Sequence, residues 1–150
     1  MNGRVVVGID GSDTAKSAAR WAAKEAEVRG MKLELVSAWE IPVYSYAFGY
    51  AIAAIPEELQ KGLVARAEEA LASALQDARS EARGVEMETI VVQGQAANAL
   101  LEVSEGANLL VVGSRGLGGF RELLLGSVSQ QCAHHSSCPV VIVRHVDEAA

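Results

Sequence analysis

Five short apolar runs, separated by segments of helical periodicity, constrain the fold of this chain more than any other feature. The first run, RVVVGI, is too short for a helix and apolar on both faces, as in a strand buried between two layers of helices. Strands that alternate with helices predict a mostly parallel sheet with right-handed crossovers. The five predicted strands are Arg4–Ile9, Lys32–Trp39, Val85–Val92, Leu109–Val112 and Val140–Val143.

The order of these strands follows from how apolar each one is. The first and fourth runs are the most uniformly apolar, so both are expected side by side at the centre of the sheet. The third run alternates apolar residues with Glu86 and Glu88, which is typical of a strand near a sheet edge. We therefore predict an α/β fold with one open five-stranded parallel sheet of order 3-2-1-4-5, flavodoxin-like or Rossmann-like, and helices on both faces. The 150 residues contain no repeat or linker, so a single domain over 1–150 is expected.

Capping residues, proline and glycine mark the helix boundaries. Ser12 is expected to cap a first helix, along which alanines recur at helical spacing. Pro56 opens a long helix that Gly84 is expected to end, with Leu59 in its buried stripe. A shorter helix is predicted over Asn98–Glu105.

The charge balance excludes several classes of partner. Thirteen basic and nineteen acidic residues give a net charge of −6, which opposes binding to nucleic acid and to anionic membranes. The N-terminus shows no small-residue cleavage site and is interpreted as the first strand. The weakly polar segment Ile41–Ile55 falls short of the ~20 apolar residues of a membrane span and is interpreted as a long loop packed on the body or on a partner. We therefore expect a cytoplasmic protein without nucleic-acid or membrane partners.

The stretch Asn108–Ser129 joins a buried strand to a glycine loop and a helix start. In an open α/β sheet, ligands bind beyond the carboxyl ends of the strands, where neighbouring connections leave toward opposite faces. Here that position lies between the first and fourth strands, which end near Asp10 and Gly113. Glycines let backbone N–H groups turn toward a ligand, and a helix N-terminus favours an anion. The residues of this kind are Gly113, Gly116, Gly118, Gly119, Gly126 and Ser127. We hypothesise a ligand that carries phosphate.

Several common motifs do not match this stretch. The P-loop pattern GxxxxGK[ST] needs a lysine, and none occurs between Gly113 and the end of the fifth run. The pattern GxGxxG fails because Arg121 replaces its third glycine. No G-x-S-x-G elbow supports a hydrolase triad. The motif C-x-H-H-x2-C from Cys132 to Cys138 lacks the usual spacing of a structural zinc site, so no metal site is predicted and both thiols are expected to be reduced.

Four stretches, VVVGIDGS, GSRGLGGF, LLLGSVSQQ and CPVVIVR, occur in this order along the chain, with the spacing Gly-x2-Gly-x9-Gly-Ser across the glycine loop. Together they resemble the universal stress protein family, in a form similar to its actinobacterial members. In the ATP-binding branch of that family, the aspartate after the first strand contacts the adenosine end and the glycine loop holds the phosphates. The resemblance implies an ATP site at Gly8, Asp10, Ala38, Val112, Gly113, Arg115, Gly116, Gly126, Ser127 and Val128. Ala38 matches only by its position at the end of the second strand.

The resemblance implies a stress-response regulator or sensor that acts by binding ATP, with Mg²⁺ as a possible companion ion. AMP or cyclic AMP in place of ATP is one alternative, and slow ATP hydrolysis or phosphotransfer is another. Apart from Asp10, no water-activating base is evident, which favours binding over catalysis. Asp10 has a second interpretation as a turn or cap carboxylate of the first helix, a role that Ser12 can also fill.

The apolar fifth strand is an aggregation risk if it lies bare at a sheet edge. Pairing with the same strand of a second subunit would cover it, and the family resemblance also implies a two-fold dimer. We therefore expect a homodimer formed through Val140–Val146.

Overall fold

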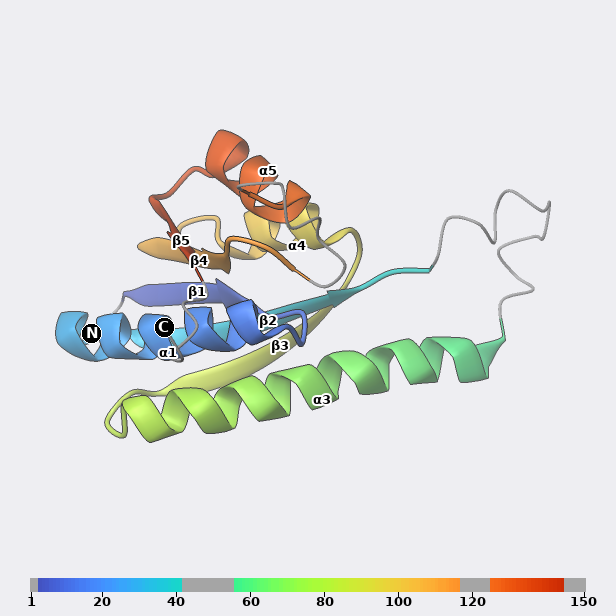
Figure 1. Ribbon diagram of the computed structural model, residues 1–150, viewed down its shortest axis with the longest axis horizontal. Coiled ribbons are helices and arrows are strands. Elements are labelled where there is room, and N and C mark those ends of the chain that lie inside the picture. The colour runs from blue at the N-terminus through green and yellow to red at the C-terminus, as the bar shows by residue number, and fades with distance from the viewer. Residues whose placement is uncertain (1–2, 42–55, 117–124, 145–150) are drawn as a thin grey trace, which may run out of the picture.

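A five-stranded parallel sheet lies at the centre of the described part of the chain (Figure 1). The computed structural model describes residues 3–41, 56–116 and 125–144. The strands are β1 (Arg4–Gly8), β2 (Lys32–Trp39), β3 (Met87–Gln93), β4 (Leu109–Gly113) and β5 (Val140–Val143). They lie in the order β3-β2-β1-β4-β5, and each neighbouring pair is parallel. The predicted order 3-2-1-4-5 and the flavodoxin-like fold are therefore confirmed.

Two layers of helices cover the sheet, one on each face (Figure 1). On one face α1 (Asp13–Arg29) and α3 (Glu57–Glu81) pack over one hydrophobic cluster, and on the other α4 (Ala96–Val103) and α5 (Ser127–His135) pack over a second. Alternate residues of β1 enter the two clusters: Val5 and Val7 the first, and Val6 the second. All three are 0% exposed, as predicted for a central strand.

The helix α1 packs closely against the sheet because its buried face consists of alanines. Its N-cap is Ser12, as predicted, and the Ser12 Oγ accepts a hydrogen bond from the Ala15 N–H at 3.1 Å. The approach is so close at the end of β4 that a Cβ on Gly113 would lie 2.7 Å from the Thr14 Cγ2 and 3.2 Å from the Thr14 carbonyl carbon. Gly113 is therefore needed for the packing of α1, whatever else it does.

The long helix α3 differs from its prediction at both ends. Pro56 is the N-cap, and the helix stops at Glu81 before Gly84. Leu59 is 39% exposed, so its placement in the buried stripe was wrong. The buried residues of α3 begin only at Ala67, because the first part of the helix extends past the sheet (Figure 1). No helix in the described ranges is long and apolar enough to cross a membrane.

Two further elements are shifted relative to the sequence prediction. α4 starts at Ala96 rather than Asn98, because the Gln95 Oε1 accepts a hydrogen bond from the Asn98 N–H at 3.0 Å and caps the helix. β3 begins at Met87, later than the predicted Val85. Most of the predicted loop, residues 42–55, lies outside the described residues.

A buried carboxylate joins the sheet to α4 at the amino ends of the strands. The Glu34 side chain on β2 is 8% exposed and lies 2.7 Å from the Arg4 Nη1 and 3.0 Å from the Lys32 Nζ. A hydrogen bond from Lys32 and the charge of Glu34 raise the pKa of Lys32 above 10.5. The Arg4 guanidinium also donates to the carbonyls of Val103 and Glu105, at the end of α4. Arg4 therefore neutralises Glu34 and satisfies carbonyls that the helix leaves unpaired.

Replacing Arg4 tests this arrangement. Arg4→Met is expected to lower the free energy of unfolding by about 3 kcal/mol, because it leaves the Glu34 carboxylate buried with Lys32 alone. The double variant Arg4→Met/Glu34→Met is expected to recover most of the loss, since no buried charge then remains. Urea denaturation at pH 7 measures both. A double variant less stable than Arg4→Met would contradict this account of the pair.

A second stability test uses glycine. Gly113→Ala is expected to lower the free energy of unfolding by about 1–3 kcal/mol through overpacking against Thr14. The matched control is Gly62→Ala on α3, where an added Cβ meets nothing within 4 Å. That variant is expected to gain about 0.5–1 kcal/mol from helix propensity. Thermal and urea unfolding followed by circular dichroism compare the two, and equal effects would show that Gly113 is not a packing requirement.

Candidate functional site

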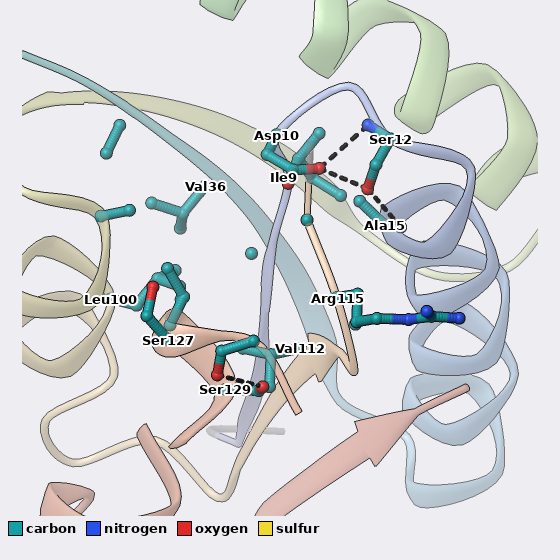
Figure 2. A pocket seen from close by; sticks show the side chains of 17 residues that line it. Ile9, Asp10, Ser12, Ala15, Val36, Leu100, Val112, Arg115, Ser127 and Ser129 are labelled. Carbon is teal, nitrogen blue, oxygen red and sulfur yellow. Dashed lines mark hydrogen bonds between the residues drawn. The ribbon is translucent and has the colours of Figure 1, made fainter. Parts of the chain in front are cut away.

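A cavity of about 510 Å³ opens at the carboxyl ends of β1 and β4 (Figure 2). The chain leaves β1 toward α1 on one face of the sheet and continues from β4 to α5 on the other, so the crevice lies where the connections diverge. All ten residues proposed from the sequence line it: Gly8, Asp10, Ala38, Val112, Gly113, Arg115, Gly116, Gly126, Ser127 and Val128. The loop glycines Gly118 and Gly119 lie outside the described residues.

Seven further residues line the cavity that the sequence analysis did not assign to it. They are Ile9, Ser12, Ala15, Val36, Ala96, Leu100 and Ser129. Val36 precedes Ala38 by two positions on β2, so the period of the strand was a signal that could have found it. Ala96 and Leu100 come from α4, whose position over the crevice depends on the crossover after β3 and has no local sequence signal. A Cβ on Gly8 would lie 2.7 Å from the Leu100 Cδ1, so Gly8 lets α4 approach β1.

Asp10 links the end of β1 to the start of α1. Its Oδ1 accepts hydrogen bonds from the Ser12 N–H at 2.9 Å and from the Ser12 Oγ at 2.6 Å. The turn interpretation of Asp10 is therefore correct, and Ser12 serves as the helix cap beside it. Its other oxygen, Oδ2, lies so close to Gly116 that a Cβ on Gly116 would clash with it. The same carboxylate thus reaches from α1 to the glycine loop and lines the cavity between them.

The start of α5 presents backbone donors to the cavity. Gly126 is the N-cap and has no side chain to cap the helix, so the first N–H groups of the helix lack the usual side-chain acceptor. The N–H of Gly126 is already used, because it donates to the Ser114 carbonyl at 2.7 Å. The sequence analysis counted it among the phosphate donors, and this part of the interpretation was wrong. The N–H groups of Ser127 and Val128 remain as the donors of this segment.

Gly126 itself is not required by the backbone or by its protein neighbours. Its φ of −75° and ψ of 171° are open to any residue. A Cβ there would lie 3.5 Å from both the Arg115 Cα and the Ser114 carbonyl oxygen, which is ordinary contact. Glycine at this position instead keeps space open next to the helix start.

The charges at the cavity are few. Among the described residues that line it, only Asp10 and Arg115 are ionisable. Figure 2 shows the Arg115 side chain extending toward α1, away from Ser127 and Leu100. Val36 and Leu100 form an apolar wall on the opposite side. The cavity thus combines an apolar region with a region of backbone donors at the loop and helix start.

The cysteine and histidine motif lies at the far end of α5. Cys132 is 0% exposed in the cluster beneath α4 and α5, and burial raises the pKa of its thiol to about 11. The Cys138 thiol lies 3.4 Å from the Ser136 Oγ, and the rings of His134 and His135 are 6.3 Å apart. Within the described ranges, no group of three or more His, Cys, Asp or Glu side chains could hold a metal ion.

Comparisons with known proteins agree with this fold. A universal stress protein of Thermus aquaticus is 39% identical over 143 residues, which are 93% of this chain and 97% of that protein. One of Mycolicibacterium smegmatis is 33% identical over 149 residues, which are 97% of this chain and 49% of that protein, so the chain spans about half the length of that relative. A solved universal stress protein in complex with cAMP is 28% identical, with a TM-score of 0.68 and coverage of 95% of this chain and 96% of that chain.

The model of the universal stress protein family matches residues 1–144, which include every described strand and helix. That match and the relatives at 33% and 39% identity show that this chain belongs to the universal stress protein family.

Proposed function

We propose that this chain is an ATP-binding universal stress protein that acts in the cytoplasm as a stress-response regulator or sensor. The observation that carries the proposal is the cavity at the carboxyl ends of β1 and β4, where an apolar wall faces a glycine loop and an uncapped helix start. Its volume of about 510 Å³ is in the range of small-molecule sites, roughly 300–1,000 Å³. A nucleotide has a matching two-part chemistry, a planar aromatic base whose faces pack against apolar side chains and an anionic phosphate chain.

The base would occupy the apolar part of the cavity. Val36 and Ala38 from β2 and Leu100 from α4 supply side chains without charge or hydrogen-bonding groups on that side. Asp10 lies at the end of β1, between this part and the loop, and its carboxylate would accept hydrogen bonds from ribose hydroxyls. In this arrangement the sugar would lie between the base and the phosphates.

The phosphates would bind where two donor segments meet. One is the loop from Gly113 to Gly116, apart from the Ser114 N–H, which already donates to the Val143 carbonyl. The other is the start of α5, where the Ser127 and Val128 N–H groups and the positive end of the helix dipole favour an anion. Arg115 would turn from α1 to pair with phosphate. Two donor segments can bind more than one phosphate group, as in the Mg²⁺-bound triphosphate of ATP. This favours ATP over a monophosphate.

A monophosphate is the second candidate ligand. The solved universal stress protein in complex with cAMP, 28% identical to this chain, supports adenine nucleotides as the ligand class without selecting the number of phosphates. ATP turnover has less support. Asp10 is the sole carboxylate among the described residues of the cavity, and it is assigned above to the ribose hydroxyls, so the described lining offers no second carboxylate to activate water. Binding, rather than hydrolysis, is therefore the proposed activity.

The ligand is tested on purified protein and on one variant. Denaturing the purified protein should release a bound adenine nucleotide, which mass spectrometry of the supernatant identifies. Calorimetric titration of the protein with ATP should then give a measurable dissociation constant. Gly126→Ala should weaken ATP binding about tenfold or more, because its Cβ would occupy the space beside the helix start, while the melting temperature stays close to wild type. Gly62→Ala, away from the cavity, is the control and should bind ATP normally. Absence of any adenine nucleotide affinity in the wild type would refute the proposal.

We also propose a homodimer formed through β5. This strand is at the edge of the sheet, and the two carbonyls of Pro139 and Val143 accept hydrogen bonds from the β4 side, from Leu110 and Ser114. In a parallel ladder, alternate residues turn their backbone groups to opposite sides, so those of Val140 and Ile142 point away from β4. An edge with exposed backbone groups on an apolar strand is suited to antiparallel pairing with its copy about a two-fold axis. Residues 145 and 146 of the predicted interface lie outside the described residues.

The dimer is tested by removing one outward N–H group. Ile142→Pro is expected to shift the protein from dimer to monomer, because proline cannot donate across the edge. Ile142→Ala loses similar packing but keeps the N–H, and it should remain dimeric. Sedimentation equilibrium gives the mass of each species, and circular dichroism verifies that both are folded. Equal masses for the two variants would rule out backbone pairing through β5.

A further inference from the structure

A buried hydroxyl connects the two segments of the cavity that present backbone donors. Ser129, in the first turn of α5, is 2% exposed. Its Oγ lies 3.1 Å from the Ser114 carbonyl oxygen and 3.0 Å from the Gly126 carbonyl oxygen (Figure 2 shows the second of these bonds). The single hydroxyl proton is thus shared between the glycine loop and the residue that caps the helix.

The Ser114 peptide is the point at which several elements join. Its carbonyl accepts from the Gly126 N–H at 2.7 Å as well as from Ser129, and its N–H donates to the Val143 carbonyl at 2.8 Å. Ser114 is 5% exposed. The end of β4, the end of β5 and the start of α5 are therefore held together at one buried residue, Ser114. Arg115 and Gly116 follow it directly, at the wall of the cavity.

We propose that Ser129 is a positioning residue for the phosphate end of the bound nucleotide, an inference that rests on the proposed function above. Its hydroxyl adds a second hydrogen bond, beside that of the Gly126 N–H, from the helix start to the Ser114 carbonyl. Together these bonds set the distance between the loop at Gly116 and the helix start at Ser127, which are separated in sequence by residues 117–126. A phosphate chain that spans both segments needs their donors at one mutual spacing. The side chain acts through backbone carbonyls and need not touch the ligand.

The neighbouring hydrogen bonds indicate that this role is separable from folding. Without the hydroxyl, the Ser114 carbonyl keeps the Gly126 N–H at 2.7 Å, and the Gly126 carbonyl keeps the Gln130 N–H at 3.0 Å. Each carbonyl therefore retains a partner, and the large cost of a buried unsatisfied group is avoided. What is lost is the side-chain hydrogen bond between the two segments, so that the single backbone bond from Gly126 to Ser114 holds them less rigidly.

A matched control is available on the same face of the sheet. Ser104 at the end of α4 is 1% exposed, and its Oγ donates to the Leu101 carbonyl at 3.3 Å. It resembles Ser129 in burial and in its bond to a carbonyl three positions earlier, yet it does not line the cavity. Ser104→Ala therefore reports the effect of losing a buried serine hydroxyl without the proposed role.

The experiment compares ATP with adenosine in calorimetric titrations. Ser129→Ala is expected to raise the Kd for ATP about tenfold and to leave the Kd for adenosine within about twofold, because only the phosphates span the two segments. Ser129→Cys, which keeps the shape of the side chain with a somewhat larger atom but donates weakly, should give the same pattern. Ser104→Ala should leave both dissociation constants unchanged, with a comparable change in melting temperature.

Three outcomes would overturn the inference. Equal loss of ATP and adenosine affinity would mean that Ser129 supports the whole cavity and not its phosphate end. Unchanged ATP affinity in Ser129→Ala would mean that the hydroxyl positions nothing, while the proposed ATP site would stand. A wild-type protein that binds no ATP would refute the proposed function, and this inference with it.

Discussion

The parallel pairing of β1 with β4 at the centre of the sheet determines where everything else in the molecule lies. Both strands are apolar on both faces, and Val5, Val6 and Val7 of β1 are without solvent exposure. The chain leaves β1 toward one helical layer and leaves β4 toward the other, which opens a crevice between their carboxyl ends. The same alternation of side chains that builds two cores therefore also creates the cavity. The position of the cavity and the arrangement of the sheet therefore both follow from the apolar sequences of β1 and β4.

The glycines of the motif have different physical causes, although the sequence presents them as one signature. Gly113 makes room for Thr14 of α1, and Gly116 makes room for the Asp10 carboxylate. A Cβ on Gly126 would make only ordinary contacts, and the backbone angles of Gly126 are open to any residue. Two glycines of this pattern, Gly113 and Gly116, are therefore explained by close packing within the protein, whether or not a ligand binds. The glycine that packing does not explain is the most informative one about the ligand.

Local sequence predicted most of the architecture and less of its detail. The strand order could be read from apolar runs, and Asp10 and Gly113 were placed together by topology alone, since parallel strands end at one edge. The glycine loop and the helix start after it added Gly116, Gly126 and Ser127, and the resemblance to a family supplied the remaining cavity residues, Gly8, Ala38, Val112, Arg115 and Val128. Leu59 was misplaced because helical periodicity does not say how far a helix extends past its sheet. Leu100 and Ser129 were missed because their positions depend on packing and on hydrogen bonds between segments distant in sequence.

The two ends of the cavity come from different segments of the chain and differ in chemistry. The loop after β4 and the start of α5 form one end of the cavity, whereas Val36, Ala38, Ala96 and Leu100 form the apolar wall from β2 and α4. None of these four side chains takes part in the hydrogen bonds that join β4, β5 and α5. Evolution can therefore change the shape of the apolar wall by a few substitutions without disturbing the hydrogen-bonded end of the cavity. On the proposed function, a lineage built on this scaffold is free to diversify the small molecule it binds while inheriting one way of holding the phosphates.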